Sequence, residues 1–89
     1  MNKLLIPIES WAVVDNVSTL GWSPLEPGHR LTGWVSTHRD LPAGMIYTSA
    51  IIRIDEAEGV VETRNTLYRL GRCNPEYAAW LRQSAARAA

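Results

Sequence analysis

The sequence predicts a mainly β domain of the α+β class, formed by a small, strongly twisted antiparallel sheet or open barrel of about five strands with one C-terminal helix. Three observations predict this fold. The 89 residues can bury one core, so we expect a single domain over residues 1–89. Short stretches with strand-like composition recur between turns rich in Gly and Pro. After residue 74, apolar residues instead recur at helical spacing.

Two strands are predicted in the N-terminal part of the chain, on either side of a loop. The first covers residues 11–15, which include two β-branched valines. Residues 21–28 contain two Pro and two Gly, a composition that excludes a helix or a central strand and indicates a loop. The second strand covers residues 31–36, where Gly33 indicates a bulge or a close approach between two backbones.

The clearest strand prediction covers residues 45–54, after a connection over 38–44. Side chains in this stretch alternate between two faces, and the alternation places Ile46, Ile52 and Ile54 on the same face. Both faces are substantially apolar. We therefore expect one continuous strand that is covered on both sides.

An acidic turn and two short strands follow. Residues 55–59 are expected to turn the chain, with Gly59 in the left-handed conformation. A strand over 60–63 then completes a hairpin. The last strand is predicted over 66–70 and ends at Gly71.

The C-terminal segment has the signals of a helix start. Asn74 can accept hydrogen bonds from the first free N–H groups, and Pro75 suits the first helical position. Glu76 is favourable at the positive end of the helix dipole. The side chains expected to dock on the sheet are Tyr77, Trp80 and Leu81.

The charge composition argues against one class of partner. Lys and Arg together number 9, Asp and Glu also number 9, and the formal net charge is zero. Binding to a phosphate backbone needs a clustered excess of cations, so direct nucleic-acid binding is not expected. Eight of the nine cations are Arg, which forms bidentate ion pairs and stacks on aromatic rings, and which therefore suits protein interfaces.

Cysteine content and hydropathy predict a cytoplasmic protein. The single Cys73 cannot form an intramolecular disulfide, which indicates a reducing compartment. The apolar N-terminus is interrupted by Pro7 and ended by Glu9, so it is too short for a signal peptide. The longest later apolar stretch, residues 45–52, is far below the roughly 18 residues of a membrane span, so no membrane association is expected.

No residue set indicates catalysis. His29, His38, Asp40 and Cys73 have the residue types of a metal site or of a nucleophile with its base, but they lack the close spacing of zinc ligands. Polar loop histidines and a half-buried thiol are the simpler interpretation. We therefore predict no catalytic residue, no metal and no cofactor.

Tryptophan is the informative excess, with four residues in the chain. Trp11, Trp34 and Trp80 lie in predicted strands or the helix, where core packing is the simpler interpretation. Trp22 lies in the Pro-rich loop, where a partly exposed indole could anchor a partner, although a role in capping the core is the alternative.

The predicted partner surface is therefore the Trp22 loop with nearby arginines, and a second choice is the polar connection before the last strand. Together these predictions name Trp22, Arg30, Arg39, Arg64 and Arg69. The acidic turn at residues 55–58 is the next candidate.

Residues 31–71 carry a recurring pattern: Gly33-Trp34-Val35, a turn containing Gly, the pair Thr48-Ser49, and a closing Thr-x-Asn-Thr-x-Tyr-x-Leu-Gly over residues 63–71. In this pattern the chain resembles a family of small phage- and prophage-borne domains of unknown function. The resemblance transfers no catalytic residue. It implies a small accessory protein of a mobile element, a class that often binds host machinery, including CRISPR and other defence complexes.

The leading functional hypothesis is non-catalytic binding to a host protein or complex in the host cytoplasm, for example as an anti-CRISPR inhibitor of host defence. A second hypothesis is a nucleotide-like ligand stacked in a cleft by Trp22, Trp34 and Tyr47 with arginines. A third is a small enzyme that uses Cys73 or a histidine. The sequence also leaves open a homodimer.

Overall fold

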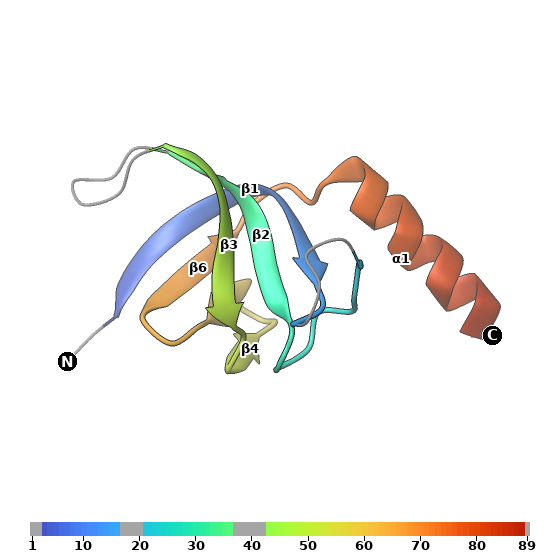
Figure 1. Cartoon of the computed structure of the whole chain (residues 1–89), viewed down its shortest axis with the longest axis horizontal. Helices are drawn as coiled ribbons and strands as arrows, with labels where there is room; N and C mark the ends of the chain where they lie inside the picture. Colours follow the sequence, from blue (N-terminus) through green and yellow to red (C-terminus); the bar gives the residue numbers. More distant parts are fainter. Residues whose placement is uncertain (1–2, 17–20, 37–42, 89) are drawn as a thin grey trace.

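The computed structural model describes residues 3–16, 21–36 and 43–88 (Figure 1). Over these residues the chain forms a six-stranded sheet of order β3-β2-β1-β6-β5-β4 and one C-terminal helix, α1. The elements are β1 (Leu4–Val14), β2 (Arg30–Val35), β3 (Gly44–Ala50), β4 (Arg53–Asp55), β5 (Val60–Glu62), β6 (Thr66–Leu70) and α1 (Pro75–Ala88). The predicted fold, mostly β with a terminal helix, is confirmed.

The sheet is mixed, whereas the sequence predicted an antiparallel one. β1 pairs antiparallel with β2 but parallel with β6, with Leu4 opposite Thr66 and Ile8 opposite Leu70. The N-terminal half of β1, which was not predicted as a strand, supplies this parallel pair. Its partner lies about 60 residues further along the chain, and local sequence pattern does not encode such a pairing.

Pro7 is tolerated inside β1 because of where its nitrogen points. The carbonyl of Ile8 accepts a hydrogen bond from the Gly71 N–H, so the backbone groups of Ile8 face β6. Adjacent residues of a strand face opposite sides, and the nitrogen of Pro7 therefore faces the β2 side. The ladder with β2 begins only at Glu9, so no ladder bond is lost at Pro7.

A bulge divides β1 into two halves. Ser10 has a positive φ of 51°, and the register against β2 shifts between Glu9 and Ala12. Residues Leu4–Ile8 pair with β6, whereas β2 pairs with Glu9 before the bulge and with Ala12–Val14 after it. Such a bulge bends a strand and increases its twist, which curves the sheet around its central strand (Figure 1).

The predicted strand over 45–54 is broken into β3 and β4. At the break, Ile51 donates its N–H to the His29 carbonyl, whereas Ile52 donates to the Glu62 carbonyl. The chain thus leaves the neighbourhood of β2 and joins β5 at the other edge of the sheet. The expected alternation fails here, because Ile51 is buried and Ile52 is exposed.

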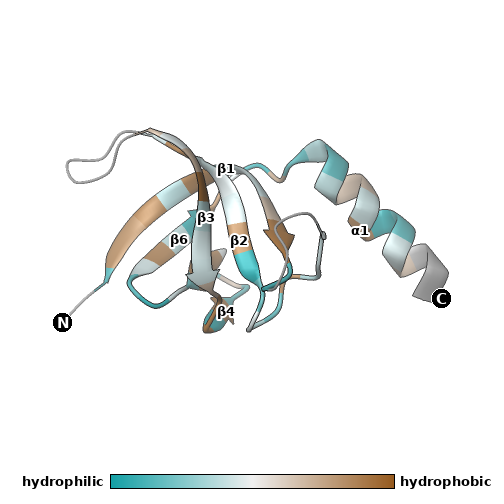
Figure 2. Cartoon of the chain, in the orientation of Figure 1, coloured by the Kyte–Doolittle hydropathy of each residue, from teal (hydrophilic) through white to brown (hydrophobic). Residues whose placement is uncertain are grey.

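The hydrophobic core lies inside the curve of the sheet and at the C-terminal end of β1. Three consecutive residues there, Ala12, Val13 and Val14, are buried, so both faces of that end are covered. Figure 2 shows the apolar residues along β1 and β2, whereas α1 alternates between hydrophilic and hydrophobic residues. The buried hydrophobic cluster comprises Ile6, Ile8, Ala12, Val13, Leu31, Val35, Ile51, Val61, Tyr68 and Tyr77.

Two local predictions are confirmed. The turn at 56–59 joins β4 to β5, with Ile54 opposite Val61, and Gly59 has a φ of 65°. At the helix start, Asn74 Oδ1 accepts hydrogen bonds from the N–H groups of Glu76 (2.8 Å) and Tyr77 (3.2 Å). Both features depend on neighbouring residues alone.

An aromatic cluster holds α1 against the sheet. Tyr77 is fully buried, and its ring centroid lies 5.9 Å from Trp11, 5.2 Å from Trp22 and 5.8 Å from Trp80. The Tyr77 hydroxyl donates a hydrogen bond to the Ser23 carbonyl. Trp11 and Trp80 are only partly buried, so Tyr77 rather than Trp80 is the main anchor of the helix.

Gly33 makes the close backbone approach that the sequence indicated. A Cβ at this position would lie 2.8 Å from Ile8 Cγ1 and 2.9 Å from the Glu9 carbonyl oxygen. We expect Gly33→Ala to reduce the free energy of unfolding by about 1–3 kcal/mol, because the β1 backbone must shift. Gly71→Ala is the control, since the atoms nearest to the added methyl group belong to the Glu9 side chain, which can move away at the cost of its hydrogen bond from the Arg72 N–H, whereas the β1 backbone cannot. Urea denaturation that shows equal losses would contradict this account.

Burial makes the stability sensitive to high pH. It raises the pKa of Tyr77, with a further contribution from nearby Cys73. As the pH rises above about 10, the Tyr77 hydroxyl loses its proton in the unfolded state before it does so in the folded state. The free energy of unfolding therefore falls. Tyr77→Phe should cost about 1–3 kcal/mol at neutral pH by leaving the Ser23 carbonyl unpaired, and should flatten the alkaline decline. Urea denaturation at neutral and alkaline pH measures both effects, with Tyr47→Phe as control. An unchanged alkaline slope in Tyr77→Phe would exclude Tyr77 as its source.

Candidate protein interface

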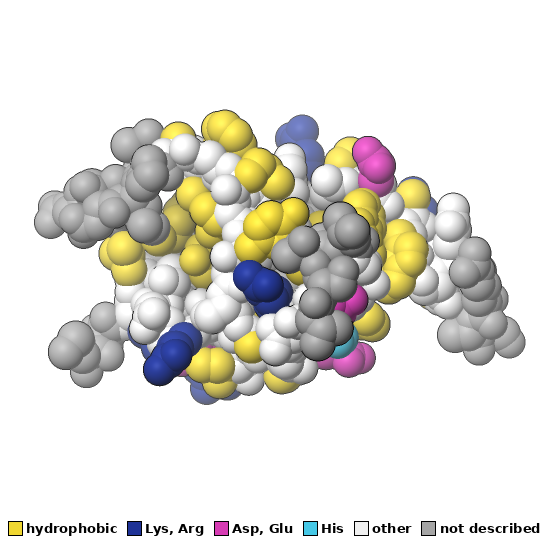
Figure 3. Space-filling view, in the orientation of Figure 1, with side chains coloured by type: hydrophobic (Ala, Val, Ile, Leu, Met, Phe, Trp, Pro, Cys, Tyr) yellow, Lys and Arg dark blue, Asp and Glu magenta, His cyan; other side chains and the backbone are white. Residues whose placement is uncertain are grey.

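Three large apolar side chains are exposed side by side on two neighbouring strands. Trp34 on β2 is 47% exposed, and Met45 and Tyr47 on β3 are 59% and 51% exposed. Trp34 lies directly opposite Met45 in the antiparallel ladder, and Tyr47 lies two residues further along β3. We call these three residues the β2–β3 face. Figure 3 shows hydrophobic side chains gathered over this part of the sheet.

The strand pattern explains why these side chains point away from the core. Gly33 and Val35, the neighbours of Trp34 on β2, are both buried, and the position of Gly33 faces Ile8 of the core. Successive residues of a strand point to opposite faces, so Trp34 points outward. Cross-strand pairing with Met45 then places a second apolar side chain on the same outer surface.

Two of the predicted arginines lie at one end of this face. Arg30 Nε donates a hydrogen bond to the Thr48 carbonyl (2.9 Å), and the Arg64 N–H donates to Ser49 Oγ (3.4 Å). Both arginines therefore contact the C-terminal end of β3, although they lie far apart in sequence. The structure thus places the guanidinium of Arg30 at the end of the apolar face, together with the main chain of Arg64.

The other predicted arginines do not join them. Arg69 is exposed on β6, where it lies opposite Val60 of β5 and Pro7 of β1. Arg39 lies outside the described residues. The structure therefore does not assemble the five predicted residues into one surface.

Trp22 occupies the core-capping position that the sequence left as the alternative. It is partly buried against the hydrophobic core and forms an isolated bridge with Val14. Its ring contacts Tyr77 in the aromatic cluster. Because Trp22 remains partly exposed while the tyrosine of the helix packs against it, its role as a partner anchor stays a prediction.

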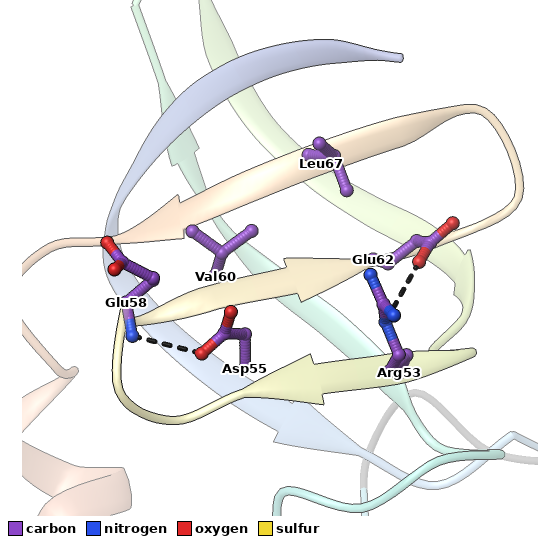
Figure 4. Close-up of a pocket in the computed structure, with 6 residues that line it drawn as sticks. All are labelled: Arg53, Asp55, Glu58, Val60, Glu62 and Leu67. Carbon is purple, nitrogen blue, oxygen red and sulfur yellow. Dashed lines mark hydrogen bonds and ion pairs between the residues drawn. The ribbon is translucent and has the colours of Figure 1, made fainter. Parts of the chain in front are cut away.

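The acidic turn is internally bonded. Asp55 Oδ1 accepts a hydrogen bond from the Glu58 N–H (3.1 Å), which closes the turn of the hairpin. The turn borders a shallow depression lined by Arg53, Asp55, Glu58, Val60, Glu62 and Leu67 (Figure 4). None of the aromatic residues of the ligand-binding hypothesis lies in this lining.

Glu62 in this depression is paired with cations. Lys3 Nζ lies 2.6 Å from Glu62 Oε2 and also donates to the Thr63 carbonyl, and Arg53 Nε lies 3.4 Å from Glu62 Oε1. The hydrogen bond from Lys3 lowers the pKa of Glu62, with smaller contributions from the charges of Lys3 and Arg53. The carboxylate of Glu62 thus stays ionised, and its negative charge is balanced by Lys3 and Arg53.

The two candidate catalytic residues that the structure describes, His29 and Cys73, each contact a main-chain carbonyl. His29 Nδ1 lies 2.8 Å from the Pro24 carbonyl, and Cys73 Sγ contacts the Asn74 carbonyl at 3.5 Å. Burial raises the pKa of Cys73, which disfavours the reactive thiolate. His38 and Asp40 lie outside the described residues. Across the described ranges, no group of three His, Cys, Asp or Glu residues could hold a metal ion.

Comparisons with family models, with curated proteins and with solved structures find no match to this chain. The functional argument therefore depends on the geometry of its own surfaces. In the part of the chain that the structure describes, no helix combines the length and apolar character needed to cross a bilayer.

Sequence reasoning assigned Trp34 to the core and so missed the β2–β3 face. A signal was present, since Trp34 alternates with Gly33 and Val35 in the predicted strand. The alternation alone did not decide which of the two sets points inward, because both contain apolar residues. The close approach between Gly33 and Ile8 settles that choice.

Trp22 in the loop and Trp34 on β2 should contribute differently to the stability of the fold. We expect Trp22→Ala to reduce the free energy of unfolding by about 2–3 kcal/mol, because it removes a ring packed against Tyr77. Trp34→Ala should cost under about 1 kcal/mol, because this half-exposed ring lies outside the core. Urea denaturation of both variants compares the two costs. A larger loss of stability in Trp34→Ala than in Trp22→Ala would contradict the assignment of Trp22, rather than Trp34, to the core.

Proposed function

We propose that this chain is a non-catalytic protein-binding domain that uses the β2–β3 face to contact its partner. The exposure of Trp34, Met45 and Tyr47 on one outer surface supports the proposal. Aromatic residues and Met are enriched where protein interfaces are buried, and Trp and Tyr dominate the binding energy there. Because the three side chains lie on paired strands, their backbone loses little freedom on binding.

The charged surroundings define what the partner should offer. The Arg30 guanidinium lies at one end of the face, where Arg64 is an exposed residue, and charge-assisted hydrogen bonds from Arg favour a carboxylate at the matching position. The partner is therefore a protein with an apolar patch and acidic residues at one side. A neutral net charge fits this limited, local use of Arg better than it fits binding to a nucleic-acid backbone.

The biological setting of the proposal follows from the resemblance of residues 31–71 to small phage- and prophage-borne domains. In this setting the chain acts in the host cytoplasm on a host protein or complex, and inhibition of a defence system, as by an anti-CRISPR protein, is its role. The ligand-binding alternative has less support, because Trp22 belongs to the aromatic cluster with Tyr77 whereas Trp34 and Tyr47 belong to the outer face.

The proposal predicts that one host protein is captured through Trp34. Tagged wild-type chain, Trp34→Ala and Ile52→Ala are used as baits in bacterial lysate, and retained proteins are quantified by mass spectrometry. Ile52 is the matched control, because it is 53% exposed but lies outside the face. We expect one stoichiometric protein with wild type and Ile52→Ala, and at least about tenfold weaker binding to Trp34→Ala, or roughly 1.4 kcal/mol.

Equal capture by all three baits would contradict the assignment of the surface. Expression of the chain in cells whose CRISPR system targets a phage tests the role in defence. Restored plaque formation with wild type and Ile52→Ala, and its loss with Trp34→Ala, is the expected result. Phage restriction that is unchanged by wild type would exclude inhibition of that system.

A further inference from the structure

The two edges of the sheet differ in how they are protected. β4, at one edge, has three residues, and the first and last of them, Arg53 and Asp55, are charged. β3, at the other edge, has seven residues and no charge. Edge strands expose unpaired backbone groups, and short length and charged side chains are what normally prevent them from pairing with another chain. Only β4 has these protections.

The backbone groups available at the β3 edge belong to Met45 and Tyr47. The carbonyl of Ile46 accepts from Thr32 Oγ1 at 2.8 Å, and the carbonyl of Thr48 accepts from Arg30 Nε at 2.9 Å, so both carbonyls point toward β2. Successive residues alternate in direction. The N–H and C=O groups of Met45 and Tyr47 therefore point toward the open edge.

We propose that β3 of one chain pairs antiparallel with β3 of a second copy, across a two-fold axis at Ile46. This register places Met45 opposite Tyr47 of the second copy and Tyr47 opposite its Met45. The groups that point outward then meet as hydrogen-bonded pairs, in which two opposite residues exchange both N–H···O bonds. An interface of this kind uses the same residues on both copies, as two-fold symmetry requires.

Charge selects a second copy in this orientation. β3 has no charged side chain, so like charges do not oppose each other across the pair. Arg30 and Arg64 contact Thr48 and Ser49 at the C-terminal end of β3, and antiparallel pairing across Ile46 separates each of these positions from its copy by four to six residues, or roughly 14–20 Å. That separation exceeds the screening length of roughly 8–10 Å at physiological salt. Parallel pairing would bring the cationic ends together.

The pairing goes beyond the proposed function, and it would change the shape and size of the surface offered to a partner. Edge pairing leaves the outer surface of each sheet uncovered, so the β2–β3 faces of the two copies would join into one continuous surface. Trp34, Met45 and Tyr47 of both copies would then face the same side of a single sheet. A partner would meet twice the apolar surface that one chain presents.

The experiment measures the mass of the purified chain by sedimentation velocity over a range from about micromolar to hundreds of micromolar, where a weak to moderate dimer dissociates and forms. We expect the mass to rise from that of one 9.9 kDa chain to that of two. Met45→Lys adds an edge charge and should weaken association at least tenfold. Ile52→Lys is the matched control, because Ile52 is similarly exposed but lies outside β3, and it should associate like wild type.

A second variant tests the backbone bonds themselves. Tyr47→Pro removes an N–H that points to the open edge while leaving the bonds to β2, so it should fold and remain monomeric. Amide hydrogen exchange at Met45 and Tyr47 in wild type should slow as concentration rises. A wild-type chain that stays monomeric throughout, or Met45→Lys that dimerises like wild type, would overturn the proposal. The sedimentation experiment uses the purified chain alone, so its result does not depend on whether Trp34→Ala loses its partner. Failure of the dimer proposal can therefore be distinguished from failure of the proposed function.

Discussion

The structure depends on one strand that pairs in opposite senses on its two sides. β1 binds β6 in parallel through its first half and β2 antiparallel through its second half, and the bulge at Ser10 lies between them. Every other strand is attached to β1 directly or through one of these two neighbours. The bulge also curves the sheet, so that β3 and β4, at its two edges, can be connected through only Ile51 and Ile52.

The second constraint is the aromatic cluster, because it decides which aromatic residues remain exposed. Tyr77 fixes the start of α1 against Trp11, and the same ring packs on Trp22 of the loop. Trp22 is thereby used to cover the core. The exposed aromatic side chains of the sheet, Trp34 and Tyr47, lie instead on β2 and β3, where strand pairing holds them in place.

The placement of charge separates the two halves of the sheet. Lys3, Arg53 and Glu62 form ion pairs near β4, and the acidic turn bonds to itself through Asp55. That edge is therefore charged and its polar groups are engaged. β3 presents an uncharged, apolar surface with arginines only at its end. A chain that is neutral overall can thus still present one distinct apolar surface.

Features set by neighbouring residues were predictable from the sequence, namely the hairpin turn at Gly59 and the Asn74 cap. Tertiary structure decided the parallel pairing of β1 with β6, the break after Ala50 and the outward direction of Trp34. It also brought Arg30 and Arg64, but not Arg69, to the end of β3. The physical reason is that capping and turn geometry depend on a few adjacent backbone groups, whereas strand partners and the inward face are chosen by contacts between distant segments.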